Sequence, residues 1–161
     1  MKTFVRIVQT LFALGVCLGV GVAQADAAKG KVYAEQAAHK MKVGDLGKAE
    51  MLYAQAMQEE PANLDFPLSL AELYIQQHRY DDAQKILKQS DTRYYRYWKT
   101  KGILLQSLQK PEQAISAFKR ALQLPGGKSD AYMLTCLQSH YESIGDSARR
   151  KQMENLLEMV E

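Results

Sequence analysis

Small residues recur along this chain at a nearly constant spacing, and this regularity constrains the fold more than any other feature. One set is Ala37, Ala71, Gly102 and Cys136, and a second set is Ala49, Ala83, Ala114 and Ala148. Within each set the successive spacings are 34, 31 and 34 residues. Small side chains let two helices approach closely where they cross. We therefore predict that one structural unit is repeated four times.

The segments between these small residues have the composition and the periodicity of short helices. They are rich in Ala, Leu, Gln, Lys, Glu and Met, and their apolar residues recur at i, i+3, i+4 and i+7. Breakers separate them at Gly44-Asp45, Pro61, Pro67, Pro111, Pro125-Gly126-Gly127 and Gly145-Asp146. We predict eight helices, at residues 30–43, 46–59, 64–77, 80–89, 92–108, 111–123, 129–143 and 146–160.

Aromatic and apolar residues accompany the small ones in a fixed register. The units carry Tyr33, Ala37, Ala49, Tyr53, Ala56 and Pro61; Leu70, Ala71, Tyr74, Tyr80, Ala83 and Leu87; Trp98, Gly102, Leu105, Ala114, Phe118 and Ala121; and Tyr132, Cys136 and Ala148. This pattern resembles the tetratricopeptide repeat. The resemblance implies an all-α fold, an α-solenoid of about four helix-turn-helix repeats in a right-handed superhelix, with repeats at about 30–63, 64–94, 95–128 and 129–161.

Departures from the repeat pattern lie at the ends of the array and at one junction. Lys40 in the first unit, and Gln152 with Asn155 in the last, are polar where the pattern is apolar or small, which is typical of capping units. Three residues are missing between Ala83 and Gly102. We expect a shortened second helix in the second unit, or a tighter turn at residues 90–92, and a local kink at that junction.

The first 25 residues have the three parts of a secretory signal peptide. Lys2 and Arg6 give a positive start, residues 11–23 are an unbroken apolar run, and Ala23-Gln24-Ala25 offers small residues at a cleavage site. We predict cleavage after Ala25, export by the Sec route and a periplasmic domain of residues 26–161. An uncleaved anchor is the competing interpretation, but the run has 13 residues, whereas a membrane span needs about 20.

Composition after cleavage narrows the classes of partner. Cys17 lies inside the apolar run and follows the branched Val16, which disfavours a lipid anchor, and its removal leaves Cys136 without a disulfide partner. The net charge falls from +3 to about +1 once Lys2 and Arg6 are removed. A nearly neutral exported domain is a poor ligand for nucleic acid. We expect no nucleic-acid partner and no membrane span in the mature chain.

The resemblance implies that a partner binds along the first helix of each pair. Carried over position by position, the groove residues are Lys31, Ala34, Ala38 and Met41; Asp65, Leu68, Glu72 and Ile75; Arg96, Lys99, Ile103 and Gln106; and Asp130, Met133, Leu137 and His140. Aliphatic side chains with a few charges predict a protein partner that offers an amphipathic helix or an extended peptide. A clamp for a C-terminal carboxylate is disfavoured, because no Asn accompanies Arg96 and Lys99.

Residues 92–101, TRYYRYWKTK, interleave four aromatic with four basic side chains. Trp98 lies at a position that the repeat buries, so it is expected in the core. Arg96 and Lys99 lie off that stripe and are the better candidates for partner contact. Replacing both with Glu is expected to weaken partner capture without lowering the melting temperature.

Catalytic chemistry finds little support in the sequence. His39, His78 and His140 lie in different repeats without metal-ligand spacing, and Cys136 occupies a small-residue position of its repeat. We expect no enzyme activity, metal or cofactor. Two functions stay open: an envelope adaptor or assembly factor, and an auxiliary or regulatory subunit of an exported enzyme or a peptidoglycan-associated complex. A glycan reader would expose aromatic groove residues, whereas these are mostly aliphatic, which favours a peptide.

Overall fold

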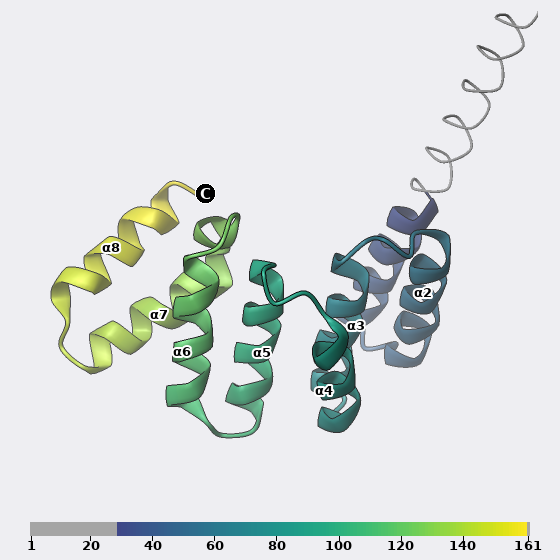
Figure 1. The fold of residues 1–161 in the computed structure, drawn as a ribbon, viewed down its shortest axis with the longest axis horizontal. Helices are drawn as coiled ribbons and strands as arrows, with labels where there is room; N and C mark the ends of the chain where they lie inside the picture. Colours follow the sequence, from purple (N-terminus) through teal and green to yellow (C-terminus); the bar gives the residue numbers. More distant parts are fainter. Residues whose placement is uncertain (1–28, 161) are drawn as a thin grey trace, which may run out of the picture. The chain divides into compact units, whose positions relative to one another are not determined.

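The computed structural model describes residues 29–160, which are helical apart from short turns. A helix over residues 29–42 is followed by α2 (Leu46–Glu59), α3 (Asp65–Gln76), α4 (Tyr80–Gln89), α5 (Tyr95–Ser107), α6 (Pro111–Leu122), the 3₁₀ turn η1 (Gly127–Ser129), α7 (Ala131–Ser143) and α8 (Ser147–Glu158) (Figure 1). The predicted signal segment, residues 1–25 with Cys17, lies outside the described residues.

Every predicted helix is found, and the largest difference at a helix start is three residues. The helix expected from residue 92 begins at Tyr95. The Asp91 carboxylate accepts a hydrogen bond from the backbone N–H of Arg93 at 2.8 Å, which stabilises a turn in place of the first helical residues. Tyr94 is extended, with φ −94° and ψ 127°. The prediction of an all-α fold made of paired helices is confirmed.

The three missing residues shorten a helix. The helix α4 has 10 residues, whereas α2 has 14 and both α6 and α8 have 12. The expectation of a shortened second helix in the second unit is therefore confirmed. The kink expected at the same junction stays a prediction.

Two compact units make up the chain, the first ending at Phe66 and the second beginning at Pro67. In the first unit Ala37, Ala49 and Ala56 are fully buried, so the small residues lie where the helix 29–42 meets α2. A side chain at Gly30 would reach to within 3.1 Å of the Glu60 Cβ. Small size is therefore required at the contact between the two helices of this unit.

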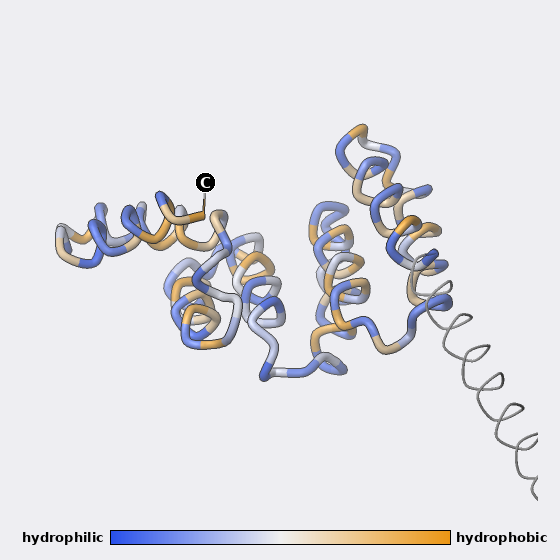
Figure 2. The backbone as a smooth tube through the Cα atoms, turned by 90° about the horizontal axis from the view of Figure 1, so that it is seen from above, coloured by the Kyte–Doolittle hydropathy of each residue, from blue (hydrophilic) through white to orange (hydrophobic). Residues whose placement is uncertain are grey.

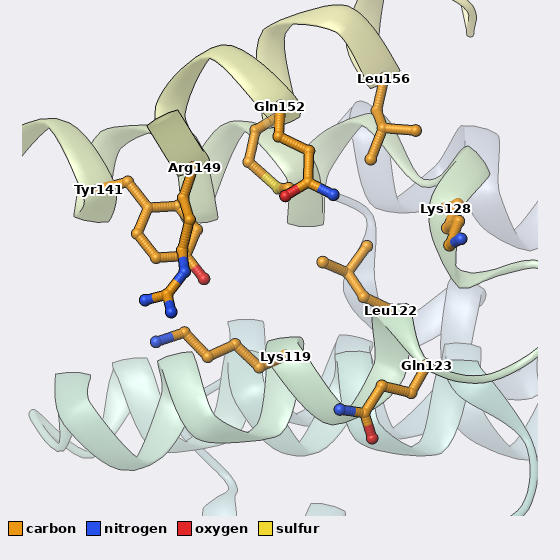
Figure 3. A pocket seen from close by; sticks show the side chains of 9 residues that line it. Lys119, Leu122, Gln123, Lys128, Tyr141, Arg149, Gln152 and Leu156 are labelled. Atoms are coloured by element: carbon orange, nitrogen blue, oxygen red, sulfur yellow. The ribbon is translucent and has the colours of Figure 1, made fainter. Parts of the chain in front are cut away.

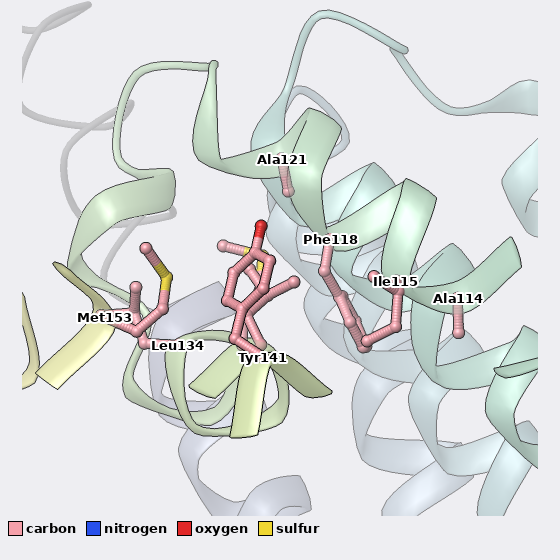
Figure 4. Packing of buried hydrophobic residues seen from close by; sticks show 9 residues of the cluster. Ala114, Ile115, Phe118, Ala121, Leu134, Tyr141 and Met153 are labelled. Atoms are coloured by element: carbon pink, nitrogen blue, oxygen red, sulfur yellow. The ribbon is translucent and has the colours of Figure 1, made fainter. Parts of the chain in front are cut away.

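The second unit contains the helix pairs α3/α4, α5/α6 and α7/α8. Figure 2 shows hydrophobic and hydrophilic residues interspersed along these helices, as expected of helices that bury one face. One buried cluster joins α3, α4 and α5 through Leu68, Ala71, Ile75, Ala83, Leu87 and Leu104. A larger one joins α6, α7 and α8 through Ala114, Ile115, Phe118, Ala121, Met133, Leu134, Leu137, Tyr141 and Met153 (Figure 4).

Gly102 shows why the repeated small positions are small. A Cβ at this residue would lie 2.2 Å from Cε1 of Phe118, whose ring is fully buried. Since no Cβ fits at that distance, the close packing of α5 on α6 requires glycine at this position.

Two of the predicted small positions pack less tightly than expected. Ala148 is exposed, and the buried residue of α8 is Met153, five residues further along the helix. Cys136 is only partly buried, since its Sγ lies at the surface within 3.8 Å of the Gln106 amide nitrogen. Gln152 and Asn155 are also exposed, as expected of a capping unit.

Candidate binding surface

Side chains from the first helices of the second unit meet in a connected polar surface. We call it the first-helix surface, and it consists of Ser69, Glu72, Arg96, Lys99, Gln106, Asp130, Tyr132 and Cys136, together with the fully buried Thr100, which bonds to Glu72. These residues come from α3, α5, the N-cap of α7 and α7 itself. Their contacts link each first helix to the next.

Between α3 and α5 the connection is made by one carboxylate, one guanidinium and two hydroxyls. Arg96 lies 3.6 Å from Glu72 and donates a hydrogen bond to the Ser69 hydroxyl at 3.2 Å. The fully buried Thr100 hydroxyl donates to the same Glu72 carboxylate at 3.0 Å. The side chains of Arg96 and Glu72 are only 19% and 24% exposed, so the pair is screened less than a surface ion pair. The geometry therefore fixes the orientation of both charges.

Between α5 and α7 a tighter ion pair does the same. The Lys99 ammonium lies 2.8 Å from the Asp130 carboxylate, and these side chains are 18% and 10% exposed. Asp130 is also the N-cap of α7, where its other oxygen accepts the backbone N–H of Met133 at 3.1 Å. The Asp130 carboxylate thus caps the N-terminus of α7 and also pairs with the lysine of the preceding repeat.

Tyr132 continues the surface along α7. Its hydroxyl donates to the Gln106 side-chain carbonyl at 3.0 Å, and the amide nitrogen of Gln106 faces the Cys136 sulfur at 3.8 Å. Partial burial, reinforced by Cys136 and by the carboxylates of Glu72 and Asp130, raises the pKa of Tyr132 to about 12. The phenol therefore stays protonated and remains a hydrogen-bond donor at physiological pH.

The structure separates the predicted groove residues into a buried set and a surface set. Leu68, Ile75, Met133 and Leu137 are buried, with at most 5% of their surface exposed. Their assignment to the groove surface is corrected: they are apolar residues that pack against neighbouring helices, so their side chains form the core beneath the surface.

The remaining groove residues keep some exposure. In the second unit these are Glu72, Arg96, Lys99, Ile103, Gln106, Asp130 and His140. In the first unit they are Lys31, Ala34, Ala38, Met41 and Asp65. Met41 accepts a hydrogen bond from the Tyr53 hydroxyl at 3.6 Å, and the Asp65 backbone N–H donates to Asn63 at 2.9 Å. That these side chains touch a partner stays a prediction.

The expectation that Arg96 and Lys99 can be reversed without loss of stability does not fit this geometry. Both cations are partly buried and paired, and a Glu at either position would lie against an existing carboxylate. Ser69 and Thr100, which complete the surface, were not predicted. The opposite charges on successive groove positions, Glu72 with Arg96 and Lys99 with Asp130, were the signal for these inter-repeat pairs.

Trp98 makes contacts within the chain that stabilise the fold. Its indole N–H donates to the backbone carbonyl of Thr92 at 2.7 Å, which fastens the turn before α5. The Lys101 ammonium and the Arg120 guanidinium approach its ring centroid to 4.8 Å and 4.3 Å. Trp98 is half-buried and packs against the buried cluster of α6, α7 and α8, so it lies at the edge of the core and not, as had been expected, within it.

The described part of the chain was expected to hold neither a metal ion nor a membrane-spanning helix. No group of three or more His, Cys, Asp or Glu side chains within residues 29–160 is arranged to hold a metal ion. No helix of that same range is both long and apolar enough to cross a membrane.

Comparison with known proteins bears on the type of repeat and on the fold. A tetratricopeptide repeat family model matches residues 40–95. Among solved structures, the first TPR domain of Spaghetti (RPAP3) bound to the HSP90 peptide SRMEEVD is 20% identical, with a TM-score of 0.56 over 74% of this chain and 95% of that chain. The second TPR domain of the same protein, also bound to that peptide, is 23% identical, with a TM-score of 0.53 over 63% and 97%. A MamA crystal structure is 21% identical, with a TM-score of 0.51 over 82% and 73%. No curated protein sequence matches the chain. These likenesses show the fold.

Proposed function

We propose that this chain, an α-solenoid of tetratricopeptide repeats, is a protein-interaction module that holds a peptide or a helix of its partner against the first-helix surface. The observation that carries the proposal is the network linking α3, α5 and α7. It fixes Glu72, Arg96 and Lys99 in place while leaving each side chain partly exposed. Two domains of the same fold have been solved with a bound peptide, which supports the same class of ligand here.

Preorganisation is the physical reason for favouring this surface. Binding immobilises side chains at a cost of about 0.5–1.5 kcal/mol for each long, flexible one. Ion pairs and hydrogen bonds within the first-helix surface have already restricted Arg96, Lys99 and Gln106. These side chains have already lost conformational entropy during folding, so a partner that docks there loses less free energy by ordering them.

Charge balance narrows the chemistry of the partner segment. Glu72 and Asp130 neutralise Arg96 and Lys99, so the surface has no net charge from these four residues. A strongly acidic or strongly basic peptide could form an ion pair with this surface only by breaking one of the internal ion pairs. We infer a segment of mixed polarity that hydrogen-bonds to Gln106 and Tyr132 and packs on the half-buried Ile103.

A pull-down tests the proposal with matched variants. The mature chain is used as bait in an envelope fraction, beside Gln106→Trp on the first-helix surface and Ser116→Trp at an exposed position of α6. Gln106→Trp is expected to reduce capture of a specific partner, and Ser116→Trp is expected to leave it unchanged. Equal capture by both variants, with unchanged melting temperatures, would remove the first-helix surface from consideration.

We further infer that the module acts in the cell envelope as an adaptor or assembly factor, after export by the Sec route and cleavage of residues 1–25. The three-part segment at the start of the chain supports this inference. Fractionation followed by N-terminal sequencing is the test. A periplasmic protein that begins at Asp26 is expected, whereas a membrane-bound protein that retains Lys2 and Arg6 would contradict cleavage.

A further inference from the structure

A second surface of this unit has a different chemistry from the first-helix surface. A cavity of about 610 Å³ opens between α6 and α8; we call it the second-helix cavity, and it is lined by Lys119, Leu122, Gln123, Lys128, Tyr141, Arg149, Gln152, Met153 and Leu156. The lining contains three cationic side chains and, among the residues that the structure describes, no carboxylate. None of these lining residues belongs to the charge-balanced first-helix surface.

The three cations lie at the two ends of the cavity. Figure 3 shows Lys119 and Arg149 pointing toward each other at one end, with Lys128 at the other and Leu122 and Leu156 between the ends. A ligand that fills this space meets positive charge, then apolar surface, then positive charge again. The arrangement selects an extended segment with acidic residues on both sides of apolar ones.

Two of the cations lie close to the same aromatic ring, that of Tyr141. The Lys119 ammonium lies 5.1 Å and the Arg149 guanidinium 5.7 Å from the centroid of the Tyr141 ring. Tyr141 is 95% buried, so the ring is a rigid base that holds two like charges close together. An anion bound between the two cations would relieve their mutual repulsion, and nothing in the lining supplies one.

Internal pairing leaves most of this charge available. Arg149 lies 3.3 Å from Asp146, whose other oxygen accepts a hydrogen bond from the Arg149 backbone N–H. Within residues 29–160, Lys119 and Lys128 form no ion pair. The cavity thus has two cations that no described residue neutralises by an ion pair.

We propose that the second-helix cavity binds an acidic peptide segment in which apolar residues stand between carboxylates. The two ends of the cavity bind the carboxylates, with Lys119 and Arg149 at one end and Lys128 at the other, and Leu122 and Leu156 pack against the apolar residues between them. This site is independent of the one proposed on the first-helix surface. A partner that carries both kinds of segment would be held at two places.

A fluorescence-anisotropy titration tests the proposal with a defined probe. The probe is fluorescein-labelled Gly-Ser-Glu-Glu-Leu-Leu-Glu-Glu-Ser-Gly, and its control has Gln in place of every Glu. The mature chain is expected to bind the acidic peptide at least about tenfold more tightly than the Gln control, and binding should weaken as ionic strength rises. Failure of the acidic peptide to bind, or equal binding of both peptides, would overturn the proposal.

Matched protein variants separate this cavity from general electrostatic attraction. Lys119→Glu with Lys128→Glu is expected to lower affinity for the acidic peptide by about tenfold or more. The control, Lys88→Glu with Lys110→Glu, makes the same change in net charge around a smaller cavity of about 320 Å³ between α4, α5 and α6. That control is expected to bind like the parent protein. An equal loss in both variants would show non-specific attraction and overturn the site.

Two further experiments check the folding of the variants and the binding of anionic lipid. Circular dichroism melting checks that each variant is folded, and Lys119→Gln with Lys128→Gln replaces the Glu variant if the latter is not; it too is expected to lose affinity. Sedimentation with vesicles of phosphatidylserine and phosphatidylcholine tests the other anionic source. Sedimentation of the protein with these vesicles, without peptide binding, would assign the cavity to a lipid surface and contradict the proposal.

Discussion

The first-helix surface and the second-helix cavity use the same kinds of side chain in opposite ways. On the first-helix surface, each cation faces a carboxylate of the neighbouring repeat, as Lys99 faces Asp130 at 2.8 Å. In the second-helix cavity, Lys119 and Lys128 form no ion pair within residues 29–160, and Arg149 pairs only with Asp146, the cap of its own helix. Paired charges organise the stack of repeats, whereas cations without an internal carboxylate partner are available to a ligand.

This difference leads to distinct expectations for substitution. Changes on the first-helix surface should cost stability, because its charges are partly buried and mutually dependent. Changes in the second-helix cavity should weaken binding and leave stability almost unaltered, because its cations make few stabilising interactions with the rest of the chain. Each prediction below tests one side of this contrast.

The largest effect is expected for Arg96→Glu combined with Lys99→Glu. Each new carboxylate would lie against Glu72 or Asp130 in a partly buried site. We expect the free energy of unfolding to fall by roughly 3–5 kcal/mol, measured by urea denaturation. The same charge change in Lys88→Glu with Lys110→Glu is the control, and equal stability in both variants would show that the inter-repeat pairs contribute nothing.

Removing one helix cap from each surface gives the next effect. Asp130→Ala removes the cap of α7 and leaves Lys99 without its carboxylate, so a loss of about 2–4 kcal/mol in the free energy of unfolding is expected. Asp146→Ala removes the equivalent cap of α8, whose partner Arg149 is 60% exposed, and should cost only about 1 kcal/mol. Denaturation midpoints of the two variants check the difference; similar losses would contradict a special role for Asp130.

A smaller effect is expected in the second-helix cavity. Lys119→Glu alone places a carboxylate near Arg149 and removes a repulsion between like charges. The free energy of unfolding should change by no more than about 0.5 kcal/mol, because the repulsion that is removed offsets the lost contact of the ammonium with the Tyr141 ring. Thermal melting measures it, and a clear loss of stability would mean that Lys119 has a structural role.

The smallest effect concerns Tyr132. Because the pKa of Tyr132 is raised to about 12 in the folded chain, its ionisation should give a late step near pH 12 when absorbance is followed during alkaline titration, and Tyr132→Phe should remove that late step. Since the folded state holds this proton more tightly than the unfolded state, the contribution to stability is present below about pH 10 and is lost as the pH rises toward 12. A titration without a late step would contradict the polar environment described for Tyr132.

The sequence was sufficient for the helices and for much of the repeat packing. Spacing of small residues located the close contacts, as Gly102 against Phe118 shows, and the missing residues were correctly expected to shorten α4. The family pattern assigned a face to each first helix, but it did not tell which residues of that face a neighbouring helix covers. Leu68 and Met133 were therefore placed on a surface and are core residues.

The second-helix cavity was beyond prediction for a related reason. Its lining comes from α6, η1, α7 and α8, and the cations are far apart in the sequence. Only the packing of these elements brings Lys119, Lys128 and Arg149 around one space. By contrast, the ion pairs of the first-helix surface join equivalent faces of neighbouring repeats, so opposite charges at those positions were a usable signal.

The central claim is that a partner polypeptide contacts the first-helix surface, and site-specific photocrosslinking in intact cells tests it most directly. Benzoylphenylalanine is introduced in place of Gln106 on that surface and, as the matched control, in place of the exposed Ser116 on α6. We predict an ultraviolet-dependent crosslink to a specific partner protein from position 106 and none from position 116. The absence of any crosslink from position 106, or the same product from both positions, would contradict the claim.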